Sequence, residues 1–165
     1  MKYYLGLGSN LGDSREIIRK ALSLIEKRGL GEIIACSSLY LTEPVDMDSG
    51  GWFLNAVCAV ESNLAPEKMM QELLAIEKEL GRKRIKGKKN LPRTIDIDIL
   101  IVDDIIYKSD TVIIPHPKIK ERRFVLEPLS EIAPELVEPI SKKTISELLA
   151  NLTNNKKVIK LNEKF

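Results

Sequence analysis

The stretch Thr94-Ile95-Asp96-Ile97-Asp98-Ile99-Leu100-Ile101-Val102 is the clearest structural signal in the chain. Isoleucines alternate with two carboxylates, which is the period of a strand that buries only one of its faces. We therefore expect a strand over residues 94–102. Ile95, Ile97 and Ile99 would point into the core, and Asp96 and Asp98 would share the opposite face.

The segments before this strand follow a simple order of elements. We expect a strand at Tyr3–Leu7, a helix after Asp13, strands over 32–41 and 53–62, and a helix that Pro66 opens and Gly81 ends. The order β-α-β-β-α-β is typical of a ferredoxin-like α+β fold, with both helices on one face of an antiparallel sheet. We interpret residues 1–165 as a single domain whose C-terminal extension enlarges the sheet and closes one side.

The glycine run at residues 6–12 and the apolar residues of the second helix add detail to this predicted fold. The run Gly6-Leu7-Gly8-Ser9-Asn10-Leu11-Gly12 is interpreted as the turn from the first strand into the first helix, because its spacing makes only a weak dinucleotide fingerprint. The apolar stripe expected for the second helix consists of Met69, Met70, Leu73, Leu74 and Leu80.

The composition is that of an ordinary globular protein. A net charge of +2 over 165 residues does not favour a dedicated nucleic-acid-binding protein. Cys36 and Cys58 lie in strand-like runs and match no metal-binding spacing. Neither a signal peptide nor a membrane span is predicted, so we expect a cytoplasmic monomer that binds no membrane and no nucleic acid.

Asp96 and Asp98 are candidate metal ligands. Two carboxylates about 6–7 Å apart along a strand repel each other unless a cation lies between them. Hard oxygen ligands suit Mg²⁺ bridged to phosphates, although a solvated strand face would show the same pattern. Asp-x-Asp also occurs in glycosyltransferases that hold a metal–nucleotide sugar, so the motif indicates metal and phosphates but not which reaction.

A basic segment directly precedes the carboxylates. Guanidinium groups bind phosphate oxygens in pairs, so this segment is suited to close over a polyphosphate, whereas an isolated charged run is usually a solvated surface. Neither a Walker A motif nor a kinase catalytic loop is present, so ATP would be bound by a different set of residues. The basic residues are Arg82, Lys83, Arg84, Lys86, Lys88, Lys89 and Arg93.

The sequence leaves the roles of two single residues, Glu77 and His116, undecided. Glu77 lies on the apolar stripe of the second helix, where it is either solvated at the rim or faces a nucleotide or the basic segment. His116 is the only histidine, and prolines on both sides fix its backbone. A lone histidine is more often structural, but a rigid loop can also hold a histidine in a fixed position to bind a ligand.

Several motifs, in order along most of the chain, resemble the 6-hydroxymethyl-7,8-dihydropterin pyrophosphokinase family of folate biosynthesis. The matching motifs are Gly8-Ser9-Asn10-Leu11-Gly12, Ser38-x-Tyr40-x-Thr42, Phe53-Leu54-Asn55-Ala56, Gly81-Arg82-x-Arg84, Pro92-Arg93-Thr94-Ile95-Asp96-Ile97-Asp98, Pro115-His116 and Arg122-x-Phe124-x-Leu126-x-Pro128-Leu129.

The resemblance implies transfer of pyrophosphate from ATP to the hydroxymethyl group of the pterin, with release of AMP. It implies two Mg²⁺ ions at Asp96 and Asp98, and a pterin ring stacked between Phe53 and Phe124. It implies catalytic roles for Arg82 and Arg93 and nucleotide binding by Glu77, Arg84, His116 and Arg122. The pterin edge would be read by Asn55 and by the backbone near Thr42, Pro44 and Val45.

The chain departs from the family pattern near the expected site. Lys89-Asn90-Leu91 stands where the family usually has Arg-Trp-Gly, so the tryptophan that caps the active site is missing. Phe53 replaces a frequent tyrosine, and Glu43 stands beside Pro44 where many members have proline. These changes concern the closure of the site, and no residue is assigned as general base.

Two other classes of protein compete with this interpretation. A ferredoxin-like sheet with a basic loop would bind RNA, although such binding needs aromatic residues on the open sheet face and the chain has few. A nucleotide-sugar or NAD-linked enzyme would rest on the acidic pair or on the glycine run. Binding of RNA, NAD or a nucleotide sugar distinguishes these classes from an enzyme that uses Mg-ATP.

Overall fold

The structure is a computed structural model and describes residues 1–10, 13–43, 51–81, 95–154 and 156–163. The strand β1 (Lys2–Ser9) pairs antiparallel with both β4 (Phe53–Glu61) and β5 (Asp96–Val102). The sheet order is β5-β1-β4-β3-β8, and β2 pairs with a further part of β4. The remaining strands are β2 (Glu32–Cys36), β3 (Tyr40–Thr42), β8 (Val158–Lys160) and the separate pair β6 (Tyr107–Lys108) and β7 (Ile113–Ile114).

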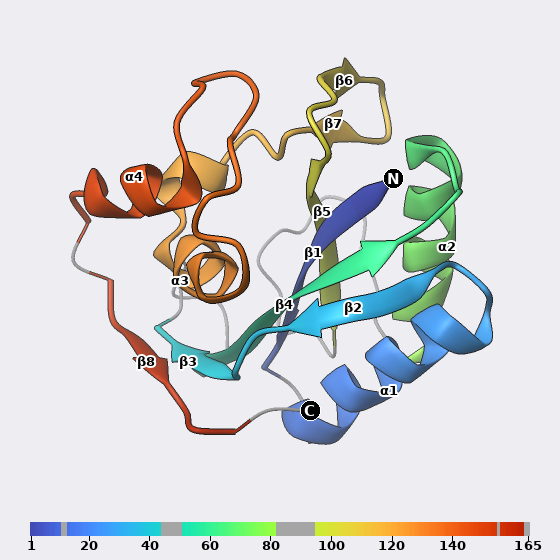
Figure 1. The fold of residues 1–165 in the computed structure, drawn as a ribbon. Coiled ribbons are helices and arrows are strands. Elements are labelled where there is room, and N and C mark those ends of the chain that lie inside the picture. Colours follow the sequence, from blue (N-terminus) through green and yellow to red (C-terminus); the bar gives the residue numbers. More distant parts are fainter. Residues whose placement is uncertain (11–12, 44–50, 82–94, 155, 164–165) are drawn as a thin grey trace.

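The helices α1 (Ser14–Lys27) and α2 (Pro66–Glu79) cover one face of the main sheet (Figure 1). The Asp13 carboxylate caps α1, because it accepts a hydrogen bond from the backbone N–H of Glu16 at 3.3 Å. Pro66 begins α2 at a position where its missing N–H needs no partner. Both helices pack on aliphatic strand residues in one core, whose buried members include Leu5, Leu7, Ile18, Ile25, Met69, Leu73, Ile97 and Ile99.

The C-terminal part of the chain covers the other face, so the molecule has three layers (Figure 1). It contributes the short 3₁₀ helix η1 (Ile119–Glu121) and the helices α3 (Arg123–Ile132) and α4 (Ile145–Ala150). A reciprocal capping box of Thr144 and Glu147 begins α4. The expected extension is confirmed: β8 enlarges the sheet, and α3 and α4 pack on Tyr4, Val57, Ala59, Leu100 and Ile101.

The first strand is longer than predicted. β1 continues to Ser9, so Gly6 and Gly8 are strand residues and not part of a turn. The prediction was wrong because glycine was taken as a turn signal, whereas these glycines let neighbouring side chains approach the sheet closely. Gly12 lies outside the described residues.

The strand predicted over residues 32–41 is in fact two strands, β2 and β3. Between them, the backbone N–H and the hydroxyl of Ser38 donate to the Glu131 carboxylate of α3 at 2.9–3.1 Å. The strand breaks there because a carboxylate from another layer provides the partner that a neighbouring strand would otherwise provide.

The stripe predicted for α2 was wrong at one position. Leu74 is 41% exposed, and Ile76 is fully buried in its place.

Among the described helices, none is long and apolar enough to cross a membrane.

Candidate functional site

The carboxylates of β5 lie where the alternation predicts. Ile97 and Ile99 are buried in the core with α1 and α2, while Asp96 and Asp98 are half-buried on the opposite face. Asp96 is the register partner of Gly8 on β1, and Asp98 is the partner of Gly6. Because the glycines carry no side chain, the side chains of Leu100 and Asn55 can lie close over β1 beside the two carboxylates.

Gly8 also separates the carboxylates from a polar residue on the next strand. Its partner on β4 is Asn55, so Asn55, Gly8 and Asp96 form a row across three strands. Two strand spacings place the backbones of Asn55 and Asp96 about 10 Å apart. A Cβ atom on Gly8 would lie 2.7 Å from Asn55 Nδ2. The absence of a side chain at Gly8 therefore leaves room for the Asn55 amide to lie over β1, between β4 and the carboxylates of β5. We call the strip of β1 at Gly6 and Gly8 the glycine floor.

The hydroxyl of Thr42 fixes the orientation of the Asn55 amide. Both residues are buried, at 2% and 8% exposure, and Thr42 Oγ1 donates to Asn55 Oδ1 at 2.6 Å. That length is typical of an O–H···O bond and short for an N–H donor, which identifies the oxygen end of the amide. The Nδ2 end then lies beside Gly8, and it has no hydrogen-bond partner among the described residues. A buried amide donor without a partner is costly, so the site is suited to a ligand that supplies an acceptor.

Asp98 lies at the centre of a charged group. Arg122 Nη1 is 3.6 Å from Asp98 Oδ2, and His116 Nε2 is 4.0 Å from the same oxygen. The Arg122 guanidinium also lies over the Phe124 ring, 5.4 Å from its centroid. The sheet, the segment before η1 and the start of α3 thus converge on Asp98.

His116 has a defined proton position. Its Nδ1 accepts a hydrogen bond from the backbone N–H of Lys118 at 3.1 Å, so the neutral ring carries its proton on Nε2, toward Asp98. Burial and then the Arg122 guanidinium lower the pKa of His116 to about 4, while Asp96 acts in the opposite direction. At neutral pH this side chain is therefore an uncharged N–H donor.

Glu77 lies inside the molecule. It is 3% exposed, and its carboxylate accepts a hydrogen bond from the backbone N–H of Ile97 at 2.8 Å. Ile97 stands between Asp96 and Asp98, so Glu77 connects α2 to the part of β5 that carries both carboxylates. The solvated rim position considered for Glu77 is wrong, because the packing of α2 on β5 encloses it.

A hollow of about 250 Å³ opens beside Asp98 and His116. Its walls are Met70 of α2, Ile99 of β5 and the loop Ser109–Ile113 between β6 and β7. Its lining combines aliphatic side chains with the hydroxyls of Ser109 and Thr111 and the carboxylate of Asp110. A flat heterocycle with hydrogen-bonding edges suits such a mixed surface. This loop was not predicted as part of the site, because a hairpin of two-residue strands has no periodic pattern in the sequence. Its only signal is its place just before Pro115-His116.

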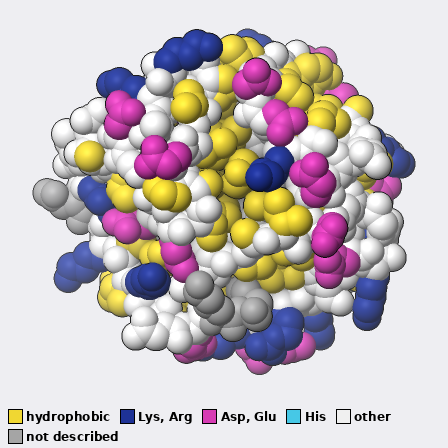
Figure 2. Space-filling view, viewed as in Figure 1, with side chains coloured by type: hydrophobic (Ala, Val, Ile, Leu, Met, Phe, Trp, Pro, Cys, Tyr) yellow, Lys and Arg dark blue, Asp and Glu magenta, His cyan; other side chains and the backbone are white. Residues whose placement is uncertain are grey.

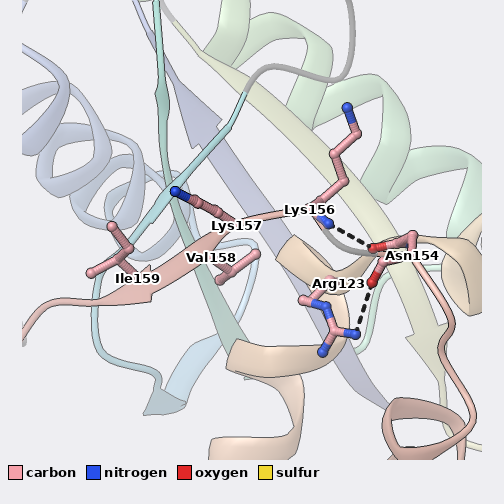
Figure 3. A pocket seen from close by; sticks show the side chains of 6 residues that line it. All are labelled: Arg123, Asn154, Lys156, Lys157, Val158 and Ile159. Carbon is pink, nitrogen blue, oxygen red and sulfur yellow. Dashed lines mark hydrogen bonds between the residues drawn. The ribbon is translucent and has the colours of Figure 1, made fainter.

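A larger hollow of about 380 Å³ lies between α3 and β8 (Figure 3). Three of its six lining residues are the cations Arg123, Lys156 and Lys157, which would favour an anion. Arg123 is engaged, since it donates to the backbone oxygen of Asn154 at 3.2 Å and lies 3.4 Å from the Glu127 carboxylate. Figure 3 also shows the ends of both lysine side chains pointing away from Arg123. The three charges do not converge on a common point.

Exposed aliphatic surface offers no alternative site. Figure 2 shows apolar side chains gathered near the middle of one face, with carboxylates along one border. Large exposed aliphatic residues in the described chain include Ile34, Ile106, Ile140 and Ile159. Hydrophobic contact alone provides none of the charge or hydrogen bonds that a reaction needs, so the group around Asp98 is the candidate active site.

Several predicted site residues cannot be placed. Arg82, Arg84, Arg93, Pro44 and Val45 lie outside the described residues. The structure brings together Asp98, His116, Arg122 and Phe124 and, separately, Thr42 with Asn55. Phe53 lies near this second group, with Cδ1 3.8 Å from a Cβ position on Gly8.

The acidic pair fits a metal ion that arrives with phosphates. In the part of the chain that the structure describes, no group of three or more His, Cys, Asp or Glu side chains is placed to hold a metal by itself. Mg²⁺ is usually held by one or two carboxylates together with substrate phosphates and water. Asp96 and Asp98, which are both half-buried on one strand face, match that ligand set.

Comparison with known proteins gives one consistent result. The family described as 7,8-dihydro-6-hydroxymethylpterin-pyrophosphokinase (HPPK) matches residues 4–134. A Methylorubrum extorquens protein named 2-amino-4-hydroxy-6-hydroxymethyldihydropteridine pyrophosphokinase is 38% identical over 149 residues, which are 90% of this chain and 92% of that protein. The Haemophilus influenzae protein of the same name is 37% identical over 159 residues, 96% of this chain and 97% of that one.

Other relatives are longer than this chain. Folic acid synthesis protein fol1 of Schizosaccharomyces pombe is 40% identical over 149 residues, and the match spans only 20% of its length. The wild-type HPPK-DHPS of Plasmodium falciparum has a similar fold, with a TM-score of 0.72 at 19% identity, over 90% of this chain and 40% of that one. By its match over most of its length, this chain belongs to the 7,8-dihydro-6-hydroxymethylpterin-pyrophosphokinase family.

Proposed function

We propose that this chain transfers pyrophosphate from ATP to the hydroxymethyl group of 6-hydroxymethyl-7,8-dihydropterin and releases AMP, as a step of folate biosynthesis. The observation that supports this most is the row Asn55, Gly8 and Asp96. It sets the backbone of a residue with a buried amide about 10 Å from that of a carboxylate, on either side of a glycine that leaves room for the amide. A flat ring read by the amide would point its substituent toward phosphates held at the carboxylates.

The pterin is proposed to bind on the Asn55 side of the glycine floor. Phe53 and Phe124 are half-buried aromatic side chains suited to stack on its two faces. Asn55 would read its edge with the orientation that Thr42 fixes. The backbone near Thr42, Pro44 and Val45 is proposed to add further hydrogen bonds.

ATP is proposed to bind on the Asp98 side. Its base would occupy the hollow between Met70 and the Ser109–Ile113 loop, and its phosphates would lie near Asp98. Bound Mg²⁺, two ions held by Asp96 and Asp98, would supply neutralisation of the phosphate charge. The nucleotide-binding residues in this proposal are Glu77, Arg84, His116 and Arg122, with Arg82 and Arg93 as catalytic phosphate ligands.

The proposed reaction is an in-line displacement. The hydroxymethyl oxygen attacks the β-phosphorus, the bond from that phosphorus to the oxygen bridging to the α-phosphate breaks, and AMP leaves. Positioning and charge neutralisation carry such a step, which is what rigid strands and an arginine pair provide. His116 would act as a hydrogen-bond donor from Nε2, because its low pKa makes it a poor base. No general base is assigned.

We further propose that β1, α1, β2, β4, α2 and β5 form a ferredoxin-like unit, supported by the order β5-β1-β4 and by the pairing of β2 with β4. In this proposal the chain acts as a single-domain monomer in the cytoplasm, without a nucleic-acid or membrane partner.

The test is product analysis with ATP, Mg²⁺ and 6-hydroxymethyl-7,8-dihydropterin. Pterin-dependent formation of AMP, in equal amount to the pterin diphosphate, is the expected result. Formation of ADP, or no turnover by protein shown to be folded, would contradict the proposal. Salt-dependent binding of RNA by the same preparation would then favour the competing binding-module function.

A further inference from the structure

The loop between β6 and β7 forms one wall of the hollow beside His116. Only two residues on each side pair as strands, and Val112 and Ile114 are buried in the core with α2 and β5. Within the loop, Ser109 Oγ accepts hydrogen bonds from the backbone N–H groups of Thr111 and Val112, each at 3.2 Å. The backbone N–H of Ser109 also donates to the Val112 oxygen at 2.9 Å. These bonds shape the loop, but they do not attach it to the rest of the molecule.

Val112 and Ile114 anchor one end of the loop in the core, and Glu67, in the first turn of α2, holds its polar side. Tyr107 donates its hydroxyl to Glu67 Oε1 at 2.8 Å, and the hydroxyl of Thr111 donates to Oε2. Ser109 Oγ lies 3.2 Å from Thr111 Oγ1, so the network continues into the loop. Hydrogen bonds from Ser109, Thr111 and Tyr107 lower the pKa of Glu67, so the carboxylate is ionised at neutral pH and the bonds are charge-assisted.

The position of Glu67 on α2 gives this attachment a consequence for the hollow. Glu67 and Met70 are three residues apart, so they lie on the same side of the helix. Met70 lines the hollow directly, whereas Glu67 holds the loop that forms the other wall. One helix therefore sets the spacing between the two walls. A flat ring bound between walls that are already in place loses less free energy to loop ordering.

We propose that Glu67 is a positioning residue, which holds the Ser109–Ile113 wall in place and thereby sets the affinity for the base of ATP. This inference rests on the proposed function, since it takes the hollow as the site of the base. Glu67 is not among the residues that line the hollow, so it acts through Tyr107 and Thr111.

The test compares the full chain with Glu67→Ala, Glu67→Gln and Gln71→Ala. Gln71 is exposed on the same helix and serves as the control. The dissociation constant for Mg-ATP and the separate KM values for ATP and for the pterin are measured. Glu67→Ala should raise both ATP constants roughly three- to tenfold, because solvent-exposed charge-assisted hydrogen bonds are lost. The kcat and the KM for the pterin should not change. Glu67→Gln keeps one acceptor oxygen and should fall between wild type and Glu67→Ala.

Thr111→Val tests the route of the effect. If Glu67 acts through Thr111, the double variant should lose less ATP affinity than the product of the two single losses. An unchanged dissociation constant for Mg-ATP in Glu67→Ala would overturn the inference. An equal rise in both KM values with a lower Tm would also overturn it, because the role would then be general stability. Failure of the wild type to form AMP would overturn the proposed function instead, and the Mg-ATP dissociation constants would still decide the role of Glu67.

Discussion

The two faces of β5 differ in the chemistry and the burial of their side chains. On one face, Ile95, Ile97 and Ile99 are buried in the core with α1 and α2. On the other, Asp96 and Asp98 are half-buried beside the glycine floor. Buried isoleucines stabilise the fold, whereas two neighbouring carboxylates repel each other unless a cation lies between them. Residues 96–99 thus carry stability and the proposed chemistry on separate faces, whereas Leu100 and Ile101 are buried in the core with α3 and α4. Substitutions at residues 96–99 should therefore separate the two properties.

The largest expected effect lies on the acidic face. Replacing Asp96 and Asp98 by asparagine keeps their shape and removes their charge. The kcat/KM should fall at least about a hundredfold, because a group that neutralises charge in the transition state contributes on the order of 3 kcal/mol. The Tm should change little, because the repulsion between the carboxylates and the ion pair between Asp98 and Arg122 are removed together. Assays of pterin-dependent AMP release and thermal unfolding on the same preparations measure both quantities. Retained turnover would remove the pair from the proposed Mg²⁺ site.

The apolar face should respond in the opposite way. Ile97→Ala removes a side chain that is 2% exposed, so it should lower the free energy of unfolding by about 2–5 kcal/mol. The backbone N–H of Ile97 still donates to Glu77 in this variant, so the carboxylates keep their support. Urea unfolding measures the loss, and activity is compared below the unfolding midpoint. Ile97→Val is the matched control, with an expected cost of about 0.5–1.5 kcal/mol. Lost activity at unchanged stability would show that the two faces are not separable.

The same contrast explains what the sequence could and could not predict about the fold. The alternation at Asp96–Ile99 and the helix after Asp13 follow from local patterns, and both were confirmed. The break between β2 and β3 depends on Ser38 meeting Glu131, which is 93 residues away. The strand conformation of Gly8 depends on Asn55 packing beside it. Such contacts between distant residues leave no periodic trace in the sequence.

The residues of the candidate site also include some that local sequence motifs indicate and some that only the folded structure reveals. Asp98, His116, Arg122 and Phe124 lie in motifs that the sequence shows, and the structure places them together. Their roles toward metal, nucleotide and pterin stay predictions. The Ser109–Ile113 wall lies in no such motif and was missed. The burial of Glu77 could not be predicted from its place on the apolar side of α2. It depends on the backbone N–H of Ile97 in β5, which donates a hydrogen bond to the Glu77 carboxylate.

A third prediction uses the difference between His116 and its carboxylate neighbours. In the unfolded chain this histidine binds a proton near its ordinary pKa of 6.5, whereas in the folded protein its pKa is about 4. Protons therefore favour the unfolded state as pH falls from 6.5 toward 4, and the stability that the neutral ring contributes is present above 6.5 and lost through this window. The loss is at most about 1.4 kcal/mol per pH unit.

Urea unfolding of the ligand-free protein at pH 7 and pH 5 measures this dependence. His116→Asn keeps an acceptor for the backbone N–H of Lys118, and it should show a smaller loss between the two pH values than the wild type. Equal losses in the two proteins would mean that the folded protein binds the proton at His116 as readily as the unfolded chain does.

The smallest effect tests the glycine floor between the two substrate sides. A Cβ at position 8 would lie 2.7 Å from Asn55 Nδ2, the end of a side chain that can rotate away, so Gly8→Ala should fold normally. Asn55 would then leave the orientation that Thr42 fixes. The KM for the pterin should rise roughly tenfold, the equivalent of one hydrogen bond, while the KM for ATP should not change. Asn55→Ala should show the same preference for the pterin, and adding Gly8→Ala to it should cause no further loss, because the displaced side chain is already absent. Additive losses would mean that the alanine blocks the substrate itself. The row across β1 would then bind the pterin by its open surface and not by the amide.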